Sequence, residues 1–150
     1  MPRRVNPPYE IFEHTADIGI KISGNDLPEL FTHAAFGLFN LVTDFDRIKL
    51  QEKREEAGSF LDLEIEAADL QALLLCWLRE LLFLFSTRRL LFTRFEFTTL
   101  APGKLKARLS AIPFYPDRDE AKHEVKAITY HQFEVKQTLS GWEAKVIIDI

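Results

Sequence analysis

The sequence predicts an α+β domain in which two amphipathic helices pack on one face of a single mixed or mainly antiparallel sheet. Apolar residues follow helical spacing near residues 27–42 and 70–85, and apolar and polar residues alternate through most of the remainder. Strands and helices do not alternate regularly, and neither Gly-x-Gly-x-x-Gly nor a P-loop is present. A doubly wound nucleotide-binding fold is therefore disfavoured.

Length and composition indicate one domain covering residues 1–150. A chain of 150 residues can bury a core without covalent crosslinks. Apolar residues make up 47% and charged residues 28%, and thirteen phenylalanines suggest a core built on large rings. The single cysteine, Cys76, excludes an intramolecular disulfide, and its apolar helical surroundings predict a small core residue.

The same composition bears on location and partners. No apolar stretch of signal-peptide length opens the chain, and no segment reaches about 18 uninterrupted apolar residues. We therefore expect a soluble cytoplasmic protein without a membrane partner. The net charge of −4 comes from dispersed acidic and basic residues, so a direct nucleic-acid interface is not expected.

The first third of the chain predicts an extended segment followed by a helix. Residues 9–23 alternate between apolar and polar side chains, which is typical of a strand. Asp26 is the predicted N-cap of the first helix, with Glu29 at the third helical position. The helical spacing continues to about Asp44.

Residues 47–66 predict two strands around Ala57-Gly58. The second strand has a row of acidic side chains, Asp62, Glu64 and Glu66, which we interpret as a solvated sheet face. A metal site is the alternative, and it would need ligands from elsewhere in the chain.

Asp69 is the predicted N-cap of the second helix, which is apolar nearly all round as far as Phe85. Such a helix is either buried on several sides or supplies an exposed surface for a partner, and burial is the commoner case. The remaining chain predicts strands near residues 92–99 and 105–111, a polar loop at 113–122, and closing strands at 123–137 and 142–150.

Two carboxylates stand out because they interrupt apolar segments at opposite ends of the chain. Asp17, with His14 close before it, lies in the first extended segment, and Asp149 lies in the last one. Polar groups in such surroundings need hydrogen-bonding or ionic partners. Asp17 could instead bond neighbouring backbone amides in a local turn. The two aspartates form one site only if the first and last strands meet.

The closing hairpin should turn near Ser140-Gly141, which would place Gln132 or Tyr130 opposite Asp149. In either register Lys126 falls on the same face as Asp149. It would nevertheless lie four to six residues along the strand, roughly 13 to 20 Å away, unless a bulge intervenes. Lys126 is therefore a weaker site candidate than the aspartates.

If the aspartates converge, their mutual repulsion favours a bound cation. A site built from oxygen ligands selects Ca²⁺, Mg²⁺ or Mn²⁺ over zinc. Glu13 or the terminal carboxylate of Ile150 could add oxygen ligands, and a nearby His14 would shift the preference toward Mn²⁺.

Several motifs, taken in order along the chain, closely resemble the archease family. They are His14-Thr15-Ala16-Asp17-Ile18-Gly19, Leu30-Phe31-x-x-Ala34-Ala35, Leu73-Leu74-x-x-Trp77-Leu78-x-Glu80-Leu81-Leu82, Lys126-Ala127-x-Thr129-Tyr130-His131 and the final Asp149. The resemblance implies that Asp17 and Asp149 are metal-binding acids and that Lys126 is a functional lysine.

The resemblance also implies a function. Archeases are accessory proteins of the tRNA-splicing RNA ligase, whose guanylylation and multiple turnover they promote, and they have a chaperone-like role in tRNA processing. We therefore expect a metal-binding activator with no catalytic residue of its own. The alternative is a stand-alone metal-dependent hydrolase or phosphotransferase that uses Asp17 and Asp149. A plain interaction module whose acids are structural is a further alternative.

Overall fold

The computed structural model describes residues 8–13, 17–50 and 59–150, and within them it confirms the α+β class. The strands are β1 (Tyr9–Glu13), β2 (Asp17–Gly24), β3 (Phe60–Glu66), β4 (Leu90–Ala101), β5 (Lys104–Pro113), β6 (Ala127–Thr138) and β7 (Gly141–Asp149). The helices are α1 (Leu27–Val42), α2 (Phe45–Leu50) and α3 (Leu70–Arg88).

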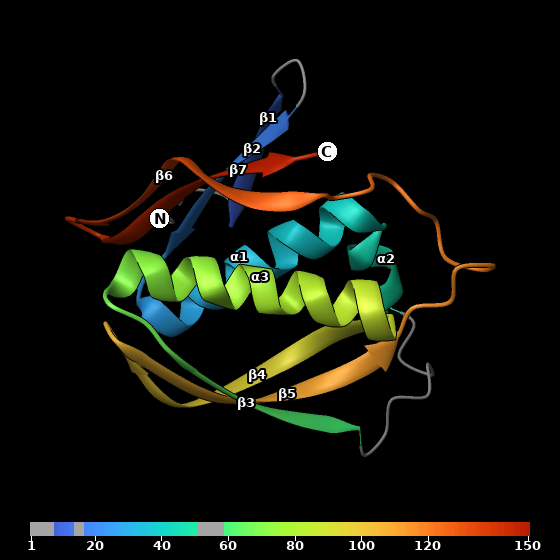
Figure 1. Ribbon diagram of the computed structural model, residues 1–150, viewed down its shortest axis with the longest axis horizontal. Helices are drawn as coiled ribbons and strands as arrows, with labels where there is room; N and C mark the ends of the chain where they lie inside the picture. Colours follow the sequence, from blue (N-terminus) through green and yellow to red (C-terminus); the bar gives the residue numbers. More distant parts are fainter. Residues whose placement is uncertain (1–7, 14–16, 51–58) are drawn as a thin grey trace, which may run out of the picture.

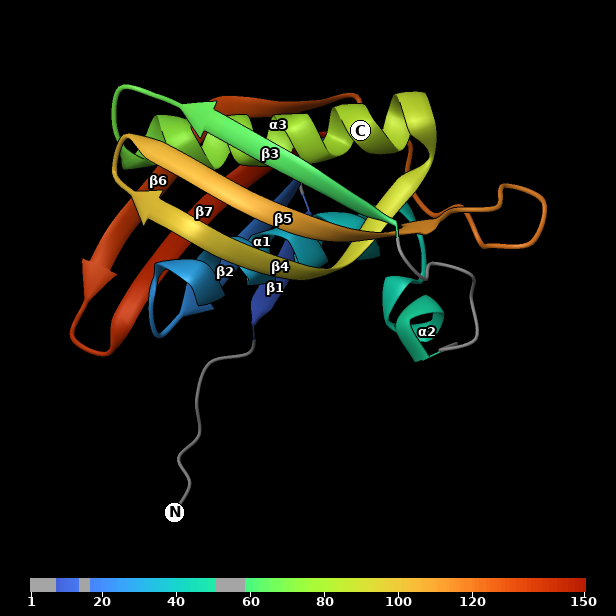
Figure 2. The same cartoon turned by 90° about the horizontal axis from the view of Figure 1, so that it is seen from below.

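The described strands form two antiparallel sheets rather than the single sheet that the sequence predicts. One has the order β1-β2-β7-β6 and the other the order β3-β5-β4. Helices α1 and α3 lie between the two sheets, so the fold has three layers (Figures 1 and 2). Alternation in a sequence marks strands but does not say which strands pair, so it could not reveal that the sheet divides.

Helix α3 is buried on several sides because it packs against both sheets. Leu74 and Leu81 are buried, and so are Leu75 and Leu84 on other sides of the helix. Its length and composition would allow it to cross a membrane, but in this fold it is the central helix of the core (Figure 1). The prediction of burial over an exposed partner surface is confirmed.

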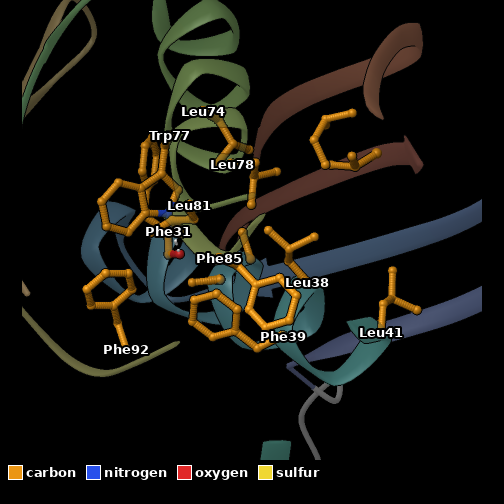
Figure 3. Packing of buried hydrophobic residues seen from close by; sticks show 14 of the residues in the cluster. Phe31, Leu38, Phe39, Leu41, Leu74, Trp77, Leu78, Leu81, Phe85 and Phe92 are labelled. Atoms are coloured by element: carbon orange, nitrogen blue, oxygen red, sulfur yellow. Dashed lines mark hydrogen bonds between the residues drawn. The ribbon is translucent and has the colours of Figure 1, made fainter. Parts of the chain in front are cut away.

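The core between the layers is aromatic. Trp77 packs against Phe31 with ring centroids 6.1 Å apart, and its indole N–H donates a buried hydrogen bond of 3.0 Å to the Phe31 carbonyl oxygen (Figure 3). This bond joins α1 to α3 and satisfies the polar atom of a fully buried tryptophan. Cys76 on the same helix is half-buried.

Helix α1 begins at the cap that the sequence predicts. The Asp26 carboxylate accepts a hydrogen bond of 2.9 Å from the Glu29 N–H, and the Glu29 carboxylate accepts one of 2.7 Å from the Asn25 N–H. Both bonds satisfy groups at the start of the helix. The helix ends at Val42, slightly before the predicted end at Asp44.

Several predicted element boundaries are wrong. Residues 9–23 form two paired strands, β1 and β2, instead of one extended segment. Residues 45–50 form the short helix α2 where the sequence suggested the first of two strands, because Phe45 and Ile48 turn toward the core at helical spacing. The predicted turn at Ala57-Gly58 lies outside the described residues.

The acidic row of β3 is a solvated sheet face, as expected. Asp62 is paired with Arg108 at 2.8 Å, and Lys104 of β5 lies 3.0 Å from Glu64 and 3.2 Å from Glu66. Each acid therefore has a basic partner on the neighbouring strand, which accounts for the row without a metal ion.

Candidate functional site

The two aspartates singled out from the sequence are neighbours across two paired strands. Strand β2 runs antiparallel to β7, and Asp17 is the register partner of Asp149. Ile18 and Ile148 form the next pair and are buried in the core, so the aspartates lie on the opposite, outer face of the sheet. The predicted meeting of the first extended segment with the last strand is confirmed.

The surroundings of the pair are partly sheltered from solvent. Both aspartates are half-buried, and the Oδ1 atom of Asp17 is buried. Directly opposed carboxylates repel one another, more strongly where water is partly excluded. An oxygen-only pair with this geometry fits a hard divalent cation better than zinc.

The pair does not complete a coordination sphere by itself. Among the described residues, no group of three or more His, Cys, Asp or Glu side chains is placed to hold a metal ion. Further oxygen ligands would have to be of another kind, such as the terminal carboxylate of Ile150, backbone carbonyls, water or a partner, or come from residues outside the described ranges. Among the described residues, the two aspartates are thus a pair of carboxylates and an incomplete ligand set.

The structure describes the three other predicted ligands to different extents. His14 lies outside the described residues, and Glu13 is described only as the β1 residue that pairs with Ile18. Ile150 follows Asp149 directly, and its side chain packs against the core.

Lys126 lies beside Asp149, because β6 contains a bulge, the condition under which the predicted separation of roughly 13 to 20 Å would not hold. The Lys126 N–H donates a hydrogen bond of 2.8 Å to the Asp149 carbonyl oxygen, and Ala127 is the register partner of Asp149. The hairpin turns at Leu139-Ser140, since Thr138 pairs with Gly141. The structure therefore groups Lys126 with the aspartates through a backbone hydrogen bond.

A bulge in β6 causes this difference. Between the Thr129–Ile147 and Glu134–Lys145 pairs, β6 has residues 130–133 where β7 has only Val146. Without the bulge, the Glu134–Lys145 register would continue to place Tyr130 opposite Asp149. The extra residues instead bring Ala127 and Lys126 to that position.

Helix α3 holds the bulge through side chains that the sequence did not single out. The Arg79 guanidinium donates hydrogen bonds of 2.9 and 3.2 Å to the Ile128 carbonyl oxygen, and Gln71 donates one of 3.3 Å to the Phe133 carbonyl oxygen. The available sequence signal for Arg79 was its charge, which together with that of the adjacent Glu80 interrupts the middle of a mostly apolar helix.

Tyr130 belongs to the bulge and lies away from the aspartates in register. Its side chain is 61% exposed, with the Arg79 guanidinium 5.5 Å from its ring centroid and the Phe133 ring at 6.4 Å. The structure therefore associates Tyr130 with Arg79, which together with Gln71 forms a clamp on the bulge.

Two antiparallel sheets around a helical layer, with an aspartate pair where β2 meets β7, define a class of small α+β proteins with an open, oxygen-only candidate cation site. The model of the Archease protein family (MTH1598/TM1083) matches residues 9–150. The chain therefore belongs to the archease family, as its motifs suggested.

Individual relatives agree with this assignment over nearly the whole chain. Protein archease of Methanosarcina acetivorans is 36% identical over 146 residues, which cover 95% of each chain. Protein archease of Pyrococcus furiosus is 38% identical and covers 95% of this chain and 98% of its own.

Solved structures share the fold. The solution structure of protein 1598 from Methanobacterium thermoautotrophicum superposes with a TM-score of 0.76 at 32% identity and covers 95% of this chain and 99% of its own. The crystal structure of an archease from Thermotoga maritima, described as a possible chaperone, gives a TM-score of 0.63 at 20% identity with both chains fully covered. The second likeness bears on the fold alone.

Proposed function

We propose that this protein is a cytoplasmic accessory protein of the tRNA-splicing RNA ligase, and that it holds a divalent cation, Ca²⁺, Mg²⁺ or Mn²⁺, between Asp17 and Asp149. It promotes guanylylation of the ligase and its multiple turnover, with a chaperone-like role in tRNA processing. The observation that carries the proposal is the register pairing of the two aspartates on the outer face of the sheet.

Membership of the archease family supports the accessory role. The family model covers residues 9–150, which is nearly the whole chain. The proposal assigns no catalytic residue to this chain.

The residues of this chain supply a rigid platform in the proposal. Strands β2 and β7 pair along eight residues from Asp17–Asp149 to Gly24–Trp142, and their inner side chains are anchored in the core. This anchoring fixes the two carboxylates relative to one another, so little ordering is needed when they bind a ligand. A bound cation would supply positive charge that can pair with phosphate oxygens of the ligase or its nucleotide.

Lys126 and Arg79 have supporting roles in this proposal. The Lys126 N–H bond to Asp149 fixes the end of β7, and the Arg79 bonds to Ile128 fix the segment of β6 that carries Lys126. The Lys126 side chain is exposed and is therefore accessible to a partner.

The test combines the purified ligase, GTP and a divalent cation, with and without this protein. We expect the wild-type protein to increase both guanylylation and turnover of the ligase, and we expect Asp17→Asn and Asp149→Asn each to abolish the increase. Glu66→Gln is the matched control, because it removes an exposed carboxylate from the other sheet.

Three outcomes would count against the proposal. No effect of the wild-type protein on the ligase would overturn the accessory role. Stimulation that survives both aspartate substitutions would overturn the cation site but keep the accessory role. Release of phosphate from GTP by the protein alone, lost in both variants, would support the stand-alone enzyme.

A further inference from the structure

The four-stranded sheet has an outer face that is turned away from the helices (Figure 1). The strand register places the side chains of this face in ordered rows. Following the register from the Asp17 end, the rows are Asp17–Asp149–Ala127, then Phe12–Gly19–Ile147–Thr129, then Glu10–Lys21–Lys145–Glu134. We call these the acidic row, the middle row and the lysine row. Acids and lysines thus share one face.

The middle row gives this face an apolar centre. Ile147 points away from the core and is nevertheless only 1% exposed. Phe12 lies across Gly19, where any side chain would overlap the phenyl ring. A sheet face that is merely solvated has no need for a sheltered isoleucine and an aromatic ring packed over a glycine.

The lysine row places two positive charges side by side. Lys21 is the register partner of Lys145, and like charges directly opposite one another destabilise a sheet. Both ammonium groups lie near the Phe12 ring, with Lys21 Nζ at 6.0 Å and Lys145 Nζ at 5.7 Å from its centroid.

In the described part of the chain, these lysines do not form ion pairs with the glutamates beside them. Glu10 is the register partner of Lys21, and Glu134 is that of Lys145, yet in the part of the chain that the structure describes neither lysine forms an ion pair.

The outer face of the three-stranded sheet can be compared with this face for its ion pairs. There, two pairs of opposite charges that face one another form ion pairs, with Arg108 at 2.8 Å from Asp62 and Lys104 at 3.2 Å from Glu66, and Lys104 also lies 3.0 Å from the diagonal Glu64. The chain therefore forms ladders of ion pairs on one outer face and leaves adjacent cations available on the other.

A groove of about 430 Å³ runs along the lysine row. Its charged lining is mixed, with three lysines and three glutamates, namely Lys21, Lys136, Lys145, Glu10, Glu134 and Glu143. A nucleic-acid strand carries a phosphate at every nucleotide and would meet the glutamates as well as the lysines. A folded protein surface can instead present a carboxylate to the lysine pair and basic groups to the glutamates.

We infer that the lysine row is a docking site for a segment of a protein partner that carries both charges, with one carboxylate between Lys21 and Lys145 and basic groups facing the glutamates of the groove. The inference rests on the proposed function, in which that partner is the RNA ligase. Lys21 lies four residues along β2 from Asp17, about 13 Å at 3.3 Å per residue. Docking at the lysine row therefore sets the acidic row against the partner at a fixed distance.

The test is the affinity of the double variant Lys21→Gln/Lys145→Gln for the ligase, measured by calorimetry at about 50 and 200 mM salt. We expect at least about tenfold weaker binding than wild type at the lower salt and a smaller difference at the higher salt. We also expect the variant's thermal midpoint to equal or exceed that of wild type, because the like-charge pair is removed. A merely structural role for the lysines predicts a lower midpoint instead.

The matched control is Arg94→Gln/Lys106→Gln, which removes two positive charges from exposed positions on the other sheet. It should bind the ligase as wild type does. If the control loses affinity equally, net charge alone explains the effect and the docking site is overturned. Unchanged binding of the lysine variant, with wild-type binding intact, also overturns the docking site but leaves the proposed function standing.

A third measurement separates protein from nucleic acid. Binding of single-stranded RNA by the wild-type protein that is lost in the lysine variant would overturn the assignment of a protein partner. Failure of the wild-type protein to bind the ligase at all would overturn the proposed function itself and this inference with it.

Discussion

The backbone N–H of Lys126 donates a hydrogen bond of 2.8 Å to the carbonyl oxygen of Asp149. This bond exists because the bulge at residues 130–133 advances β6 relative to β7. Arg79 secures the bulge by donating to the Ile128 carbonyl oxygen. A residue on the central helix thus holds the part of β6 that lies next to the candidate site.

Arg79→Met should loosen this part of the site without removing a candidate ligand. Methionine keeps much of the side-chain length but cannot donate to the Ile128 carbonyl oxygen, so we expect the free energy of unfolding to fall by about 1 kcal/mol. Hydrogen exchange at the Lys126 amide, measured by NMR, should become faster. Arg88→Met, at an exposed position on the same helix, is the control and should leave this amide unchanged. Wild-type exchange in Arg79→Met would show that the bulge holds without the clamp.

Asp17→Asn should make the protein more stable in metal-free buffer. It should also abolish the further stabilisation that an added cation gives the wild-type protein. Removing one of two opposed carboxylates relieves repulsion, worth up to about 1 kcal/mol without metal. Added cation at about 100 times its dissociation constant should stabilise the wild-type protein by about 2.7 kcal/mol. We expect no such gain for the variant in urea titrations, whereas the Glu66→Gln control should gain as wild type does. An equal gain in Asp17→Asn would place the cation elsewhere.

Gly19→Ala should destabilise the protein through Phe12. The added methyl group would overlap the phenyl ring, which must then leave the sheet surface. We expect a loss of about 1 to 3 kcal/mol in the free energy of unfolding, measured with urea. Combining it with Phe12→Ala should cost less than the sum of the two single changes, because the overlap is then gone. Additive losses would contradict the packing of the ring on Gly19.

Trp77→Phe should weaken the packing and the hydrogen bond between α1 and α3. It leaves the buried Phe31 carbonyl oxygen without its hydrogen bond and removes ring volume from a fully buried site. We expect a loss of about 2 to 3 kcal/mol in the free energy of unfolding by chemical denaturation. Trp142→Phe, at a half-buried position, is the control and should lose about 1 kcal/mol or less. Equal losses would mean that the hydrogen bond contributes nothing.

Asp62→Asn should alter how stability depends on pH. The hydrogen bond from Arg108 holds the pKa of Asp62 below its ordinary value, and the positive charge of Arg108 acts in the same direction. A lowered folded-state pKa contributes stability that is present above the unfolded value of about 3.9 and is lost as pH falls through the folded value. Because the pair is exposed, we expect a small loss of stability at pH 7 that vanishes near pH 2. Urea titrations at the two pH values check this, with the exposed Asp117→Asn as the control, which should show no loss at either pH. A loss that persists at the lower pH would mean that the pair does not act through its charge.

The sequence was sufficient for features that depend on neighbours along the chain. The Asp26 and Asp69 caps are both observed, because a cap needs only the backbone N–H three residues ahead. The row Asp62, Glu64 and Glu66 was correctly assigned to a solvated face from alternation alone.

Features that depend on contacts between distant segments were harder to predict from the sequence. Residues 45–50 formed a helix because Phe45 and Ile48 found space in the core, and the sequence alone does not show that space. Helix α3 was expected to cover one sheet, but its nearly uniform apolar surface allowed it to contact two.

The sequence by itself determined that Asp17 and Asp149 would be exceptional carboxylates within apolar strands, since alternation sets which face of a strand each residue occupies. It also carried the motifs of the archease family, which the comparisons confirm. Only the tertiary structure decided that Lys126 adjoins Asp149 and that Lys21 adjoins Lys145. Strand register depends on bulges and on anchoring by other elements, here by Arg79, and no spacing within one strand records either.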